Sequence, residues 1–111
     1  MSMPKFVKAA RVGEIPPGRG KMVMGPFDKP MALFNLDGDY YAVNSVCPHM
    51  GGPVSEGLLK GPIVACPWHG WTFDVRDGGC DHQGGHRISA YETKIEGDFI
   101  MVGWLKKGSE G

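Results

Sequence analysis

Apolar residues recur along this chain in short runs of strand type, and no long segment keeps a helical period. Gly and Pro are frequent, with 18 and 9 residues, and they separate the runs. The expected strands are 5–9, 21–24, 31–36, 40–44, 63–66, 71–75, 91–95 and 99–104. Segment 53–59 holds at most one short helical turn. The pattern predicts an all-β fold whose strands are too short for one large sheet.

Turn signals separate these runs. Asp37-Gly38 predicts a tight hairpin between 31–36 and 40–44, and Glu96-Gly97-Asp98 predicts a closing hairpin. Asp77-Gly78 marks a further turn. Alternation along the strands predicts the core positions Phe6, Val12, Met31, Leu33, Tyr41, Val43, Val64, Phe73, Ile95, Ile100 and Val102.

Two short stretches carry candidate metal ligands. Cys47-Pro48-His49 is followed, after 16 residues, by Cys66-Pro67-Trp68-His69. Each stretch offers one thiolate and one imidazole, so the two form a four-ligand set of metal-site type. Neighbouring Gly and Pro residues bend the backbone tightly, which lets several groups of one short segment point at a bound centre.

Charged residues are missing around these stretches. Segments 40–55 and 61–73 contain no Asp, Glu, Lys or Arg, and they hold all four candidate ligands. Two ordinary buried strands would also lack charge, but they would not need Cys, His and clustered Gly and Pro at their ends. The pattern favours a cofactor site at the tips of two loops on a β base.

Composition narrows the class of protein. With 111 residues we expect one domain, 1–111. The 12 basic and 12 acidic residues balance, and the lack of a long basic run argues against nucleic acid as a partner. No apolar run is long enough for a membrane span or a signal segment, so the cytoplasm is the expected location. Three cysteines, an odd number, argue for thiolates committed to a metal rather than to disulfides.

The spacing C-x-H-x16-C-x-x-H resembles that of the Rieske [2Fe–2S] family. Segments 47–57 and 66–74 look like its two cluster loops, and 33–42 resembles the hairpin leading into that site. The resemblance implies a Rieske iron–sulfur fold, a small antiparallel β-sandwich or barrel base with cluster-binding loops at about 45–57 and 64–73. It also implies that Cys47 and Cys66 bind one iron, while His49 and His69 bind the other through Nδ1.

Two departures from the high-potential members of that family predict a low reduction potential. Neither loop has the extra Cys that those proteins join as a disulfide. Trp71 and Phe73 stand where those proteins carry hydroxyl side chains that donate hydrogen bonds to the sulfur ligands. Fewer such bonds stabilise the reduced cluster less, so the potential should lie near the roughly −150 mV end of the Rieske range.

The Cys and His residues also allow two other kinds of metal site. A Cys2His2 zinc site would use the same ligand types, but zinc motifs usually group Cys with Cys and His with His. Cys80-Asp81-His82 imitates the C-x-H stretch, yet no C-x-x-H follows it. We therefore expect 79–86 to be a Gly-rich loop that covers the cluster, with Cys80 as a free thiol. A partner contact or a regulatory metal site is the alternative.

The resemblance implies an electron carrier rather than an enzyme. A mononuclear iron site would have to draw on His82 and His86, both in the Gly-rich segment. We expect a ferredoxin that accepts one electron from a flavin-dependent reductase and passes it to a terminal oxygenase of aromatic-ring dioxygenase or monooxygenase type. Docking would use a rim of Pro48, Met50, Pro67 and Trp68 around the histidine edges.

Two further functions stay open. One is the small subunit of an assimilatory nitrite reductase, which would share size and fold with a free carrier. The other is a redox sensor or binding module that uses Cys80. We expect the isolated protein to be a monomer.

Overall fold

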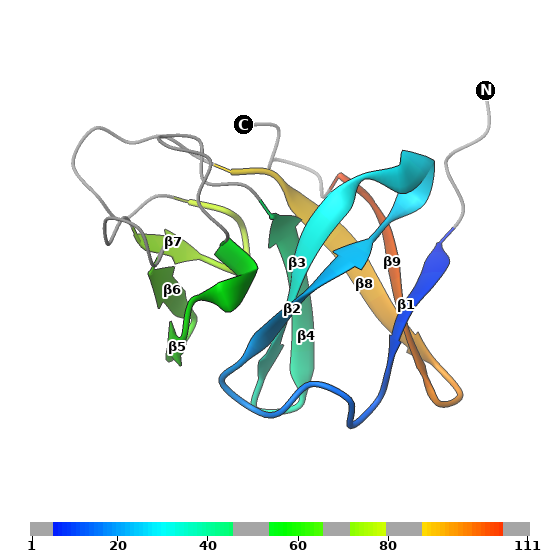
Figure 1. Cartoon of the computed structure of the whole chain (residues 1–111), viewed down its shortest axis with the longest axis horizontal. Helices are drawn as coiled ribbons and strands as arrows, with labels where there is room; N and C mark the ends of the chain where they lie inside the picture. Colours follow the sequence, from blue (N-terminus) through cyan, green and yellow to red (C-terminus); the bar gives the residue numbers. More distant parts are fainter. Residues whose placement is uncertain (1–5, 46–53, 66–71, 80–87, 106–111) are drawn as a thin grey trace.

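The computed structural model describes residues 6–45, 54–65, 72–79 and 88–105 (Figure 1). Nearly all regular structure in these ranges is β. The strands are β1 (Val7–Arg11), β2 (Gly20–Met24), β3 (Pro30–Leu36), β4 (Asp39–Asn44), β5 (Leu59–Lys60), β6 (Ile63–Ala65), β7 (Thr72–Asp74), β8 (Ala90–Glu96) and β9 (Phe99–Leu105). Two short 3-10 turns complete the set, η1 (Pro26–Asp28) and η2 (Val54–Glu56). No helix in the described ranges is long and apolar enough to cross a membrane.

The strands form two antiparallel sheets. The larger sheet has six strands in the order β1-β9-β8-β4-β3-β2, and its end strands β1 and β2 contact each other, so it closes almost completely into a barrel. The smaller sheet, β5-β6-β7, lies beside the barrel (Figure 1). It is built from the part of the chain between β4 and β8, two strands that pair with each other in the barrel.

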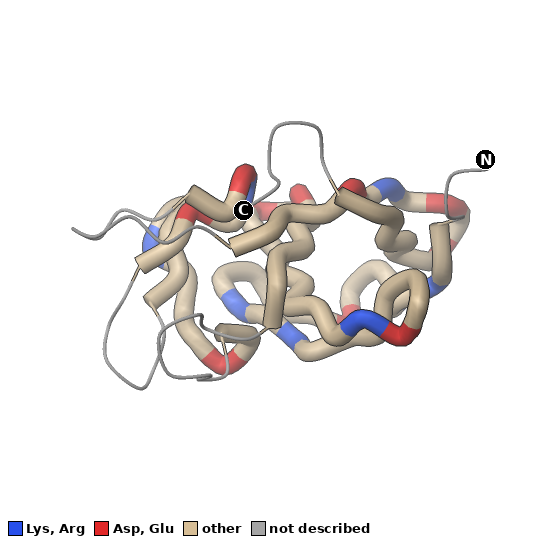
Figure 2. The backbone as a smooth tube through the Cα atoms, turned by 90° about the horizontal axis from the view of Figure 1, so that it is seen from above, with Lys and Arg blue, Asp and Glu red and all other residues tan. Residues whose placement is uncertain are grey.

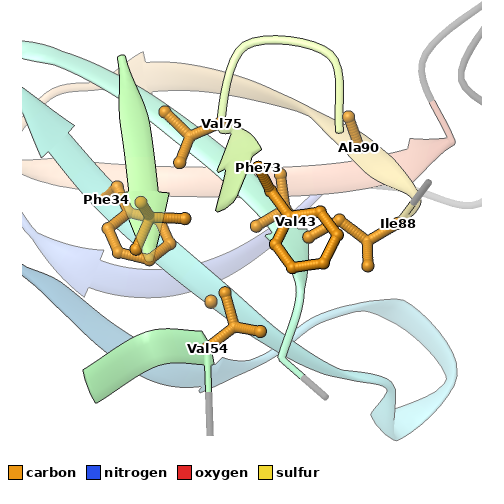
Figure 3. Packing of buried hydrophobic residues seen from close by; sticks show 9 residues of the cluster. Phe34, Val43, Val54, Phe73, Val75, Ile88 and Ala90 are labelled. Carbon is orange, nitrogen blue, oxygen red and sulfur yellow. The ribbon is translucent and has the colours of Figure 1, made fainter. Parts of the chain in front are cut away.

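Two hydrophobic clusters hold this arrangement together. The first fills the barrel with Ala10, Ile15, Val23, Met31, Leu33, Ala42, Tyr91, Ile100 and Val102. The second lies between the barrel and the small sheet, with Ala32, Phe34, Val43, Val54, Val64, Phe73, Val75, Ile88 and Ala90 (Figure 3). Because successive residues of β3 point to opposite faces, that strand feeds both clusters. We call the second set the base cluster.

The prediction of an all-β fold is confirmed, and most strand positions agree with it. The predicted first strand, 5–9, begins and ends two residues too early, since β1 is Val7–Arg11. The strand β5 and the turn η1 were not predicted, whereas η2 matches the single turn expected in 53–59. The predicted strand ends at Cys66 and Trp71 lie outside the described residues.

Both predicted hairpins are confirmed. Asp37 and Gly38 have φ of 51° and 95°, the positive values that a type I′ turn requires. Gly97 and Asp98 join β8 to β9 beyond the pair Glu96–Phe99.

The predicted core is partly right. Met31, Leu33, Val43, Val64, Phe73, Ile100 and Val102 are buried. Phe6 and Tyr41 are half-buried.

The prediction that Val12 and Ile95 lie in the core was wrong, because their exposed fractions are 46% and 52%. Val12 follows the end of β1 at the start of a turn, beyond the last residue pair of that strand with β9. Ile95 lies near the end of β8, beyond the two pairs that join this strand to β4, and is paired on one side only, with Ile100 of β9.

Candidate metal centre

The segment that carries Cys47 and His49 is anchored at both ends. It leaves the barrel at the end of β4, where the Asn44 amide donates to the Ser89 carbonyl at 2.9 Å. It returns at η2, where the Val54 amide donates to the Ser45 carbonyl at 3.0 Å. Residues 45 and 54 therefore hold the two ends of the eight-residue segment 46–53 together. We call the described residues that flank such a segment its feet.

The segment that carries Cys66 and His69 joins β6 to β7. Ala65 and Thr72 are paired across the two strands, and Val64 pairs with Phe73 one step further from the segment. Val64 and Phe73 have no exposed surface. The six residues 66–71 thus connect two strands whose register is set by a fully buried pair.

A third segment, 80–87, is closed in a similar way. The Ile88 amide donates to the Gly78 carbonyl at 3.0 Å, and the Gly78 amide donates to the Asp74 carbonyl at 2.7 Å. The Asp74 amide in turn donates to the Gly79 carbonyl at 2.8 Å. Asp74 ends β7, so the feet of the second and third segments are bonded together.

The feet of all three segments share the base cluster (Figure 3). Val43 and Val54 come from the two sides of the first segment, Phe73 follows the second, and Val75 and Ile88 flank the third. All five are buried. The residues around the candidate ligands are therefore brought together by one packed core, although they are far apart in sequence.

Comparison with known proteins decides the family. A family model for the Rieske [2Fe–2S] domain matches residues 5–92. The chain belongs to the Rieske [2Fe–2S] family. The cofactor of this family is the [2Fe–2S] cluster, which confirms the cofactor predicted from the double motif.

Individual relatives agree with this assignment. The chain is 35% identical over 101 residues to the ferredoxin component of the naphthalene 1,2-dioxygenase system of Pseudomonas aeruginosa, covering 88% of this chain and 94% of that protein.

Among solved structures, a chain of the complex of reduced oxygenase and oxidized ferredoxin in carbazole 1,9a-dioxygenase superimposes with a TM-score of 0.82. That match has 25% identity and covers 92% of this chain and 95% of the other. A chain assigned as the small subunit of an NADH-dependent nitrite reductase from Mycobacterium tuberculosis gives a TM-score of 0.84 at 26% identity, with coverages of 95% and 99%.

The predicted ligands Cys47, His49, Cys66 and His69 lie outside the described residues of this Rieske domain, as do the rim residues Pro48, Met50, Pro67 and Trp68. Cys80, His82 and His86 lie outside them too. Every Cys and His of the chain therefore belongs to one of the three segments whose feet meet on the base cluster. Within the described ranges no group of three or more His, Cys, Asp or Glu could hold a metal ion. A donor set of two thiolates and two imidazoles suits a Rieske cluster.

Three of the buried residues that carry these feet were missed from the sequence. Val54 and Ile88 lie outside both the predicted and the observed strands, so alternation gave no signal for them, whereas Val75 ends the predicted strand 71–75 two residues after Phe73 and was available from alternation. For Val54 and Ile88, an apolar residue next to a Gly-rich or Cys-containing segment was the available signal.

One ion pair lies at the foot of the second and third segments. The Arg76 guanidinium donates from Nε to Asp74 Oδ1 at 3.0 Å and from Nη2 to Asp74 Oδ2 at 2.7 Å. The hydrogen bond and the negative charge of Asp74 raise the pKa of Arg76 above its usual value. The pair places no net charge beside the feet of the Rieske loops.

Gly78 closes the foot of the third segment through a conformation and a contact that alanine cannot reproduce. Its φ is +77°, and a Cβ built there would lie 1.9 Å from the Ile88 carbonyl oxygen. Gly97 also has a positive φ, +59°, but nothing lies within 4 Å of its Cβ position. We expect Gly78→Ala to lower the free energy of unfolding by about 2–3 kcal/mol more than Gly97→Ala, because only Gly78 adds a backbone overlap to the unfavourable φ.

Thermal melting of the two cluster-loaded variants beside wild type measures this difference. Equal melting temperatures for Gly78→Ala and Gly97→Ala would show that the Gly78–Ile88 closure adds no stability.

Proposed function

We propose that this chain is a one-electron carrier that uses its Rieske cluster to pass electrons from a flavin-dependent reductase to a terminal oxygenase of aromatic-ring dioxygenase or monooxygenase type. The observation that carries the proposal is the match to the naphthalene 1,2-dioxygenase ferredoxin component, which extends over 94% of that protein. The carrier has no catalytic site of its own. When bound, the cluster takes up and releases one electron.

The ligands of this proposal are Cys47 and Cys66 on one iron and His49 and His69 on the other. Two loops, at about 45–57 and 64–73, hold them on a single domain that extends over 1–111. The support is the spacing of the double motif together with the closure of both loops at Ser45–Val54 and Ala65–Thr72. β9 lies beyond the matched 5–92 but pairs with β1 and β8, which is consistent with one domain.

The partner surface of the carrier is the rim formed by Pro48, Met50, Pro67 and Trp68. Its apolar, weakly charged residues suit the small interfaces of transient electron-transfer complexes. We place the protein in the cytoplasm and expect it to be a monomer when isolated, with neither nucleic acid nor membrane as a partner.

Transfer assays test the proposed function directly. The loaded protein is mixed with NADH and the reductase and oxygenase components of the naphthalene 1,2-dioxygenase system. We expect the rate of oxygenase reduction to depend on the concentration of this chain. A chain that is reduced but delivers no electron to the oxygenase would contradict the proposal.

A second candidate function is the small redox subunit of a nitrite reductase-like complex. It is favoured by the similarity to the Mycobacterium tuberculosis chain, with its TM-score of 0.84. Gel filtration of the protein from its native source separates the two, because a carrier should elute near its own mass of 12.0 kDa and a tightly held subunit with a large partner.

The midpoint potential is the first property that the proposal predicts. We expect a value near about −150 mV, because Trp71 and Phe73 cannot donate hydroxyl hydrogen bonds to the sulfur ligands. In the structure Phe73 is fully buried in the base cluster. An anaerobic redox titration followed by visible absorption measures the potential, and a midpoint well above zero would rule out a low-potential carrier.

A further inference from the structure

An apolar groove runs along the small sheet, beside η2. It has a volume of ≈ 540 Å³ and is lined by Glu56, Gly57, Leu58, Lys60, Ile63, Ala65 and Thr72. Glu56 and Lys60 carry opposite charges, so the lining has no net charge. Leu58 is 55% exposed, which places a large aliphatic side chain in solvent at the edge of the groove.

The groove lies between the feet of both proposed ligand loops. Ala65 and Thr72 form the pair that closes the second loop. Gly57 follows η2, the turn that begins where the first loop ends, and its amide donates to the Val54 carbonyl at 3.0 Å. A Cβ at Gly57 would lie only 2.3 Å from the Ala65 carbonyl oxygen, so the end of η2 packs directly against β6.

The mixed charges of this molecule offer no single-sign surface for a partner to bind, so apolar contact is the more informative feature. Figure 2 shows Lys and Arg interspersed with Asp and Glu along the described chain. Three of the groove residues, Ile63, Ala65 and Thr72, come from the charge-free segment 61–73. Interfaces draw most of their binding energy from a few well-packed side chains that enter pockets, with polar residues at the periphery.

We infer that this groove receives an apolar side chain of the terminal oxygenase and so anchors that partner beside the cluster loops. The inference rests on the proposed function. The groove begins at the feet of both ligand loops, so a partner that docks at these loops lies beside it, within reach of the small interface of a transient electron-transfer complex. The oxygenase is the occupant that similarity supports, since the carbazole 1,9a-dioxygenase match comes from a complex of oxygenase and ferredoxin.

Leu58→Asp tests the groove, because it places a charge at the apolar edge without disturbing a buried residue. The protein, loaded and reduced, is mixed in a stopped-flow instrument with the oxidised oxygenase component of the naphthalene 1,2-dioxygenase system at increasing concentrations. We expect the half-saturating oxygenase concentration to rise about tenfold, the effect of losing one interface anchor, while the limiting transfer rate stays within twofold.

Ile95→Asp is the matched control, since Ile95 is an aliphatic residue of similar exposure, 52%, near the end of β8 and outside the groove. It should leave the half-saturating concentration within twofold of wild type. Reduction of cytochrome c, which needs no groove, should be equal in all three proteins and shows that the cluster is intact. Equal half-saturation for Leu58→Asp and wild type overturns the inference. A wild-type protein that reduces cytochrome c but not the oxygenase contradicts the proposed function, and the inference then falls with it.

Discussion

Cys66→Ala should leave the purified protein without the visible absorption and the electron paramagnetic resonance signal of a Rieske cluster. Removing the Cys66 thiolate leaves the iron that Cys47 and Cys66 would share without a full ligand set, and alanine offers no replacement donor. His69→Ala should have the same result through the other iron. Iron and sulfide analysis of the two variants, loaded in parallel with wild type, measures the loss.

Cys80→Ala and His82→Ala are the matched controls. They remove the same chemical groups from the segment 80–87, which has no C-x-x-H partner. Both variants should keep wild-type spectra and iron content. Loss of the cluster in either one would move a ligand into that segment and overturn the assignment of Cys47, His49, Cys66 and His69.

Phe73→Ala should lower the free energy of unfolding by about 3–5 kcal/mol, the usual cost of emptying a buried aromatic site. Phe73 has no exposed surface and packs in the base cluster, where Val43 and Val54 support the first ligand loop (Figure 3). Thermal melting of the loaded protein followed by circular dichroism should show a fall of more than about 10 °C, since 1 kcal/mol moves the melting temperature of a domain of this size by several degrees.

Phe27→Ala removes the same side chain from the surface. Phe27 is 74% exposed and meets Trp104 edge-on, with ring centroids 5.1 Å apart. An aromatic pair of this kind contributes about 0.5–1.5 kcal/mol, so this variant should melt within several degrees of wild type. If the two variants lost equal stability, the base cluster would not be the support of the cluster loops.

Much of this protein follows from local sequence signals. Period-two alternation and Asp-Gly turns are properties of neighbouring residues, so the hairpins 31–44 and 91–104 were predictable. The chemistry was predictable as well, because the choice of Cys and His at C-x-H and C-x-x-H specifies the donor atoms without any knowledge of the fold. The family match to residues 5–92 agrees with that expectation.

Only the tertiary structure decided that a strand such as β3 is buried on both faces. Alternation along β3 predicted Met31 and Leu33 inside and left Phe34 unassigned, yet Phe34 is fully buried as well. The cause is the small sheet, built from residues after β4, which covers the outer face of the barrel. Whether a second sheet packs on a strand depends on residues far along the chain, so no local pattern records it.

The same packing brings the feet of the three segments together. Val43, Val54, Phe73 and Ile88 are up to 45 residues apart, and each would read in the sequence as an ordinary apolar residue beside a loop. Their shared burial is a long-range contact. The sequence alone determined which donors this protein has, and the tertiary structure decided that the loops carrying them rise from one hydrophobic base, because burying apolar surface between the two sheets is what stabilises that arrangement.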